Sequence, residues 1–140
     1  MSEIDKTYIE SRVSDWVKRV EDLYSVVKAA LANSEGIECK SAKYTIMHEE
    51  LMQENKVLPK KVPILDLYKG KTLIASFKPV GLWVIGANGR IDILTKSGAF
   101  ILVDVAEKGN KSEWKVFAPN NRKNGVVFDS ELIDKLVREQ

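Results

Sequence analysis

The chain has 140 residues, of which 44% are hydrophobic and 30% are charged. This composition supports one domain with a sizeable core, and it excludes wholesale disorder and collagen-like repeats. A single cysteine, Cys39, excludes a disulfide scaffold. No apolar run approaches the roughly 18 residues that span a bilayer, so we expect no membrane segment. The formal net charge of +2 is too small to predict nucleic-acid binding by itself.

The N-terminal segment, 1–36, has the pattern of an amphipathic helix. Its hydrophobic residues recur at alternating spacings of three and four, as in a heptad repeat. A helix of about 28 residues would be about 42 Å long, which exceeds the width of a small domain. The stripe therefore lies across the sheet of its own chain, or it forms an interface for self-association. The residues of this candidate interface are Val13, Trp16, Val20, Leu23 and Val27.

The next segment, 37–63, has the weakest pattern in the chain. Residues 44–47 could form a short strand and 48–54 a helical turn, and two prolines bracket residues 60–62. We therefore expect an irregular linker between the N-terminal helix and the rest of a single domain, 1–140.

Residues 64–128 have the sequence pattern of a β-sheet, with short apolar runs separated by turn residues. The connections are too short for parallel crossovers, which predicts an antiparallel meander. After it, Asp129 or Ser130 caps a short helix over 129–140. The fold class is thus α+β: a long amphipathic helix, a six- or seven-stranded meander curled toward a barrel, and a C-terminal helix. The expected strands are 64–68, 72–78, 82–86, 90–96, 99–106, 114–118 and 126–128.

Two dipeptides predict tight hairpins and fix the faces of the sheet. Asn88-Gly89 suits a type I′ turn, which pairs Ile85 with Asp92, and Ser97-Gly98 is a second two-residue turn. Alternation along the strands then makes both faces of the sheet apolar. One face carries Leu82, Val84, Ile91, Ile93, Phe100 and Leu102, and the other carries Trp83, Ile85, Leu94, Ile101, Val103 and Val105. Both faces need cover, from a barrel interior and the N-terminal helix or from a second copy of the chain. Asp92 and Asp104 lie in this apolar block and need partners or a position at the rim of the sheet.

Residues that could carry chemistry are few. His48 is the only histidine, so a two-histidine metal site cannot form within one chain, and Cys39 has no histidine near it in sequence. The carboxylates of Glu49, Glu50, Asp92 and Asp104 would need to converge before they could act as acid and base. The chain has no glycine-rich phosphate loop. We therefore predict no catalytic residue, no metal and no cofactor.

The preferred function is a non-enzymatic protein-interaction or assembly module that acts through the amphipathic helix or an apolar sheet face. The alternative is a module for single-stranded nucleic acid, with lysines on phosphates and aromatic side chains on bases. A small-ligand barrel or an enzyme of unknown class is a weaker alternative. No secretory signal is visible, and a single thiol is typical of a reducing compartment, so we expect a cytoplasmic protein. The candidate nucleic-acid residues are Lys60, Lys61, Lys69, Lys71, Trp83 and Arg90.

Overall fold

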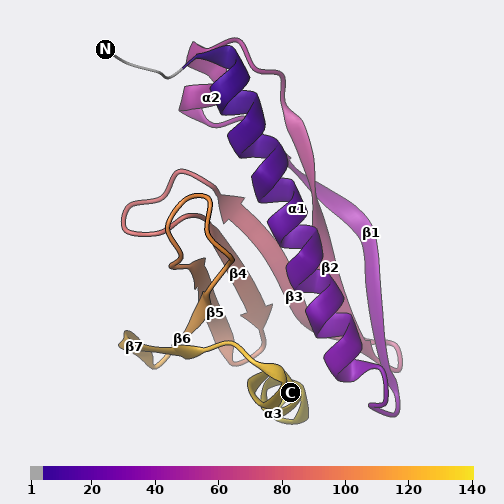
Figure 1. Cartoon of the computed structure of the whole chain (residues 1–140). Coiled ribbons are helices and arrows are strands. Elements are labelled where there is room, and N and C mark those ends of the chain that lie inside the picture. The colour runs from indigo at the N-terminus through magenta and orange to yellow at the C-terminus, as the bar shows by residue number, and fades with distance from the viewer. Residues whose placement is uncertain (1–4) are drawn as a thin grey trace.

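The computed structural model describes residues 5–140. It consists of an N-terminal helix, a seven-stranded sheet with a short helix inserted after its first strand, and a C-terminal helix (Figure 1). The elements are α1 (Lys6–Leu31), β1 (Ile37–Met47), α2 (Glu50–Glu54), β2 (Lys60–Lys69), β3 (Thr72–Gly81), β4 (Arg90–Thr95), β5 (Gly98–Asp104), β6 (Trp114–Ala118), β7 (Asn121–Val127) and α3 (Ser130–Arg138).

The sheet is an antiparallel meander in which every strand pairs with its neighbours in sequence, from β1 to β7. The predicted α+β class, the meander and both helices are therefore confirmed. The sheet curls around α1 but does not close into a barrel, so β1 and β7 remain as its edges (Figure 1).

Helix α1 lies in the hollow of the curled sheet. Its N-cap is Asp5, whose carboxylate accepts a hydrogen bond of 2.9 Å from the backbone N–H of Tyr8. No glycine or proline interrupts its 26 residues. The stripe predicted from the sequence is buried against the sheet of the same chain. It forms the centre of the core with Leu65, Phe77 and Leu102.

Helix α3 covers the rest of the same face, at the end of the molecule shown at the bottom of Figure 1. Asp129 caps it by accepting a hydrogen bond from the N–H of Leu132 at 2.9 Å. Its apolar side, with Ile133, Leu136 and Val137, is buried in the core. The two helices thus share one face of the sheet, which we call the inner face.

Tyr24 fastens α1 to the middle of the sheet. Its hydroxyl lies 2.8 Å from the carbonyl oxygen of Pro63 in β2 and 3.1 Å from that of Phe77 in β3. Burial raises the pKa of the Tyr24 phenol, so it remains a neutral donor to these carbonyls.

The prediction of an irregular linker over 37–63 is wrong. This segment contains the 11-residue strand β1, the short helix α2 and the start of β2. β1 is an edge strand, so few of its side chains are buried and its hydrophobic alternation is weak. A register shift between Lys40 and Lys43 interrupts the alternation further.

The predicted strand 82–86 and its Asn88-Gly89 hairpin are also wrong. β3 runs on to Gly81 and pairs directly with β4, and residues 82–89 form a loop between them. Contacts from distant residues hold this loop. The carboxylate of Glu49 accepts hydrogen bonds from the N–H groups of Leu82 and Trp83, at 2.8 and 3.2 Å. Tertiary contacts therefore override the local turn signal of Asn88-Gly89.

The second predicted hairpin exists, but its turn lies one residue earlier. Lys96 and Ser97 form the turn, and Thr95 pairs with Gly98. Each residue of β4 consequently faces a residue two positions earlier in β5 than predicted. A shift of two keeps every side chain on its face. Ile91, Ile93 and Leu102 are accordingly buried on the inner face, as predicted.

Candidate interaction surface

The side of the sheet that points away from α1 and α3, which we call the outer face, carries a row of apolar side chains. Ile101 of β5 pairs with Phe117 of β6, and both are partly exposed. Leu94 and Val127, toward the two sides of this pair, are 42% and 65% exposed. None of the five side chains of the row is buried by the elements of residues 5–140. Its residues are Leu94, Ile101, Val103, Phe117 and Val127.

Basic side chains exceed acidic ones on the outer face. The three acidic side chains on its strands are each within ion-pair distance of a basic group, in the pairs Glu38–Lys40 at 3.9 Å, Asp66–Lys43 at 3.4 Å and Asp92–Arg90 at 2.8 Å. Glu113, directly before β6, has no ion pair within the described residues. Three further lysines have no ion pair within the described part of the chain. They are Lys78, Lys96 and Lys115. The outer face is therefore apolar and positively charged.

A shallow hollow of about 380 Å³ lies on the outer face over β2, β3 and β4. Leu73 and Leu94 provide apolar surface in it, and Lys43, Lys78 and Lys96 are among the residues that line it. Asp66 is only 5% exposed there, and it accepts a hydrogen bond of 2.6 Å from the Ser76 hydroxyl. Because Lys43 and Ser76 already engage this carboxylate, the hollow has two lysines free to meet a ligand.

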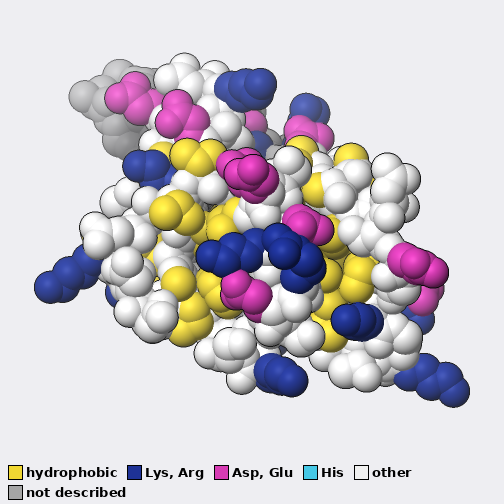
Figure 2. All heavy atoms as spheres, turned by 90° about the horizontal axis from the view of Figure 1, so that it is seen from below, with side chains coloured by type: hydrophobic (Ala, Val, Ile, Leu, Met, Phe, Trp, Pro, Cys, Tyr) yellow, Lys and Arg dark blue, Asp and Glu magenta, His cyan; other side chains and the backbone are white. Residues whose placement is uncertain are grey.

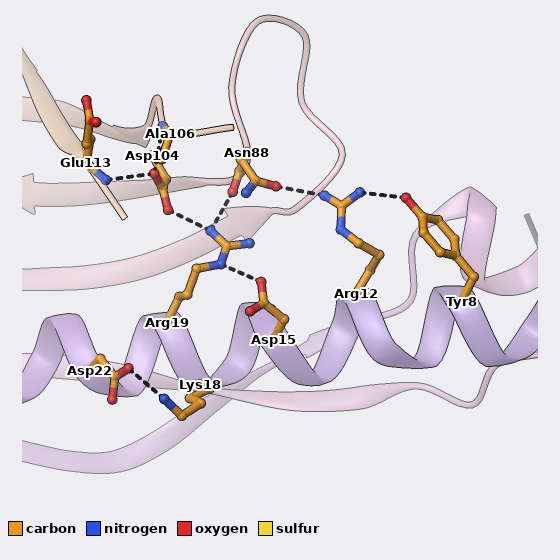
Figure 3. Close-up of polar contacts among 10 residues, drawn as sticks. All are labelled: Tyr8, Arg12, Asp15, Lys18, Arg19, Asp22, Asn88, Asp104, Ala106 and Glu113. Atoms are coloured by element: carbon orange, nitrogen blue, oxygen red, sulfur yellow. Dashed lines mark hydrogen bonds and ion pairs between the residues drawn. The ribbon is translucent and has the colours of Figure 1, made fainter. Parts of the chain in front are cut away.

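A second polar cluster joins α1 to the loops at the other end of the sheet (Figure 3). Arg19 donates from Nη1 to Asp104 Oδ2 at 2.9 Å and to the backbone oxygen of Asn88 at 2.7 Å. Its Nε donates to Asp15 at 2.8 Å. Asp104 Oδ1 accepts from the N–H groups of Ala106 and Glu113, both at 3.0 Å. Both oxygens of Asp104 are thus occupied, which suits a structural anchor rather than a catalytic acid.

The same cluster continues toward the start of α1. Arg12 donates to the side chain of Asn88 at 2.7 Å and to the Tyr8 hydroxyl at 3.3 Å (Figure 3). Lys108 also donates to the Tyr8 hydroxyl, at 2.8 Å. Hydrogen bonds from Lys108 and Arg12 lower the pKa of the Tyr8 phenol. Two arginines of one helix therefore hold Asn88, and with it the loop 82–89.

A hollow of about 570 Å³ lies between α1 and the β5–β6 connection. Leu23, Trp114 and Phe128 contribute apolar surface to it. On its rim, Asp15 is bound to Arg19 and Asp22 is bound to Lys18. These ion pairs engage the two carboxylates that α1 contributes to the rim, whereas a small-molecule site has polar groups that converge on its ligand.

A third hollow, of about 430 Å³, lies beside α3, with Phe100 and Leu136 among its lining residues. Figure 2 shows the molecule from the side where α3 lies in Figure 1. Hydrophobic side chains lie there on either side of a central group of charged ones. At this end of the molecule the apolar surface is therefore divided by charge.

The residues predicted to form sites occupy different parts of the fold. The candidate interface of α1 is buried in the core, so in this fold it is not a surface that a second copy could reach. Lys60 and Lys61 lie at the start of β2, whereas Lys69 and Lys71 lie at the β2–β3 turn, at the far end of the strand. The guanidinium of Arg12 lies over the ring of Trp83, and Arg90 pairs with Asp92. The candidate nucleic-acid residues are thus not gathered on one face.

The other residues considered for catalysis or metal binding lie in surroundings that do not favour either role. His48 is exposed, and its Nε2 lies 3.2 Å from the carbonyl oxygen of Val57. Burial raises the pKa of the Cys39 thiol, which disfavours the reactive thiolate. Glu49 caps the loop 82–89, as described above. Among residues 5–140, no three acidic, histidine or cysteine side chains gather as metal ligands would.

Comparison with known proteins gives no relative: no family model, no curated protein and no solved structure matches this chain. Within the part of the chain that the structure describes, no helix combines the length and the apolar character needed to cross a membrane.

Proposed function

We propose that this chain is a non-enzymatic protein-interaction module and that the outer face of its sheet is the binding surface. The observation that carries the proposal is the apolar row on a face that α1 and α3 leave uncovered. Partly exposed apolar side chains that lie near one another across several strands are typical of protein-binding surfaces. The inner face and the helix stripe are already buried within the chain, whereas the outer face is open to a partner.

Single-stranded nucleic acid is the less favoured ligand. Tyr68 and Tyr44 each have a lysine ammonium over the ring, that of Lys40 at 4.9 Å and that of Lys61 at 5.8 Å. Trp114 packs against Trp16, with 6.1 Å between ring centroids. These rings are not free platforms for stacking bases. The apolar row is mostly aliphatic, which suits the side chains of a protein.

Site-specific photo-crosslinking in the native cell tests the proposal. A benzophenone amino acid is placed at Leu94 or at Val127 on the outer face, and at Glu10 on the exposed side of α1 as a control. We expect one discrete protein adduct from both outer-face positions and none from Glu10. Adducts of equal yield from all three positions, or none from Leu94 and Val127, would contradict the proposal.

A further inference from the structure

We infer that the partner presents an acidic polypeptide segment with apolar side chains to the outer face. This inference rests on the proposed function and names the chemistry of its partner. The free lysines Lys78 and Lys96 line the hollow together with Leu73 and Leu94. A carboxylate within hydrogen-bond reach of these ammonium groups would place a neighbouring apolar side chain on the leucines. Charge and apolar surface thus occur together at one place.

Ion pairs within the chain leave the outer face with an excess of positive charge. The three acidic side chains within the strands of the outer face already have basic partners, so Glu113, directly before β6, offsets only part of the charge of the three remaining lysines. Lys115 extends this charge across the sheet, because it lies between Val103 of β5 and Val127 of β7. An acidic partner would meet unpaired ammonium groups across the whole apolar row. Such complementarity steers association and rejects partners of like charge.

A second copy of this chain fits the outer face poorly. In a two-fold symmetric contact the same patch lies on both sides of the interface. The three unpaired lysines of one copy would then meet those of the other, and the single carboxylate of Glu113 would offset only part of this repulsion. Like charges placed together across an interface are unfavourable. An acidic partner of different sequence removes this conflict.

Peptide binding tests the inference with defined probes. The full chain is titrated into three fluorescein-labelled ligands: a short peptide of alternating Glu and Leu, a matched peptide of alternating Lys and Leu, and a single-stranded oligothymidylate. We expect the acidic peptide to bind, with an affinity that falls as salt is added, and the basic peptide not to bind. Tighter binding of the oligothymidylate than of the acidic peptide would overturn the inference in favour of a nucleic acid.

Charge-reversal variants locate the binding on the outer face. The double variant Lys78→Glu, Lys96→Glu is compared with Lys6→Glu, Lys28→Glu, which changes the net charge equally at exposed positions of α1. We expect the first to weaken binding of the acidic peptide by about tenfold or more, since attraction becomes repulsion at two sites. The second should bind nearly as well as the parent. Equal losses would overturn the inference, because they would show a response to net charge alone.

The two proposals fail in different ways. If the acidic peptide does not bind while Leu94 and Val127 still give crosslinks, the chemistry inferred for the partner is wrong and the interaction surface stands. If the crosslinks are absent as well, the proposed function is wrong.

Discussion

Replacement of Asp104 with alanine should lower the free energy of unfolding by about 3–5 kcal/mol, the range found when one partner of a buried ion pair is removed. The side chain of Asp104 is fully buried, and it holds Arg19 of α1 at 2.9 Å. Its loss would leave the guanidinium without this partner. It would also leave the N–H groups of Ala106 and Glu113 without their acceptor. Chemical denaturation followed by circular dichroism measures the change.

Asp22→Ala is the matched control for this variant. Asp22 also pairs with a basic residue of α1, but that pair, with Lys18, is exposed to solvent. Exposed pairs one helical turn apart contribute about 0.3–0.5 kcal/mol. A loss for Asp104→Ala no larger than that for Asp22→Ala would show that the cluster in Figure 3 does not hold α1 to the sheet.

Replacement of Gly89 with valine is the second substitution that we expect to lower the free energy of unfolding strongly. The φ of Gly89, +121°, lies in the region that side chains other than glycine rarely adopt, and a Cβ atom would lie 2.2 Å from Cζ3 of Trp16. Because Trp16 is buried, its ring has little room to move. Backbone strain of about 1–3 kcal/mol and overpacking of about 1–3 kcal/mol together predict a loss of roughly 2–6 kcal/mol for Gly89→Val.

Gly86→Val separates the two causes. Gly86 also has a positive φ, of +82°, but nothing lies within 4 Å of the position of its Cβ. This variant should therefore show the strain alone, about 1–3 kcal/mol. If both variants shift the denaturation midpoint equally, then Trp16 does not lie beneath Gly89 as the structure shows.

The sequence also predicts that substitution of Gly89 destabilises the fold, but it does so from a hairpin turn that the structure does not contain. A hairpin turn at Asn88-Gly89 requires a positive φ at Gly89, and the loop of the structure also has one there. The clash with Trp16 depends on residues 73 positions apart in the chain, which no local pattern reveals. The need of Asp104 for a partner could likewise be predicted from its apolar surroundings. That the partner is Arg19, 85 residues away, could not.

Patterns that repeat along one element predict the fold well. The stripe of α1, the cap of α3 and the alternation in β4 and β5 each depend on neighbours in sequence, and each is confirmed. The β4–β5 faces survive an error of register, since a shift of two residues leaves Ile93 and Leu102 on the inner side. Most of β1, apart from the short strand suggested at 44–47, is not predicted, because an edge strand with mostly exposed side chains and a bulge has little hydrophobic pattern.

The outer face as a candidate surface is only partly predictable from the sequence, because its exposure depends on contacts between distant segments. Alternation indicates that Leu94, Ile101 and Val103 share a face. Whether that face is covered depends on where α1 and α3 pack. The charge of the outer face also depends on pairings such as Lys43 with Asp66, which join β1 to β2. Since the part of β1 that carries Lys43 is not predicted, this pairing and the hollow beside it could not be predicted either.

Solvent exposure of methyl groups reports most directly whether the outer face is open. A soluble paramagnetic chelate added to the monomeric protein at low concentration broadens the NMR signals of exposed methyl groups. We predict strong broadening for Leu94, Ile101 and Val127 and little for Ile93 and Leu102, which the helices cover. Protection of the first three methyl groups to the level of the core would contradict the outer-face assignment and the interaction surface with it.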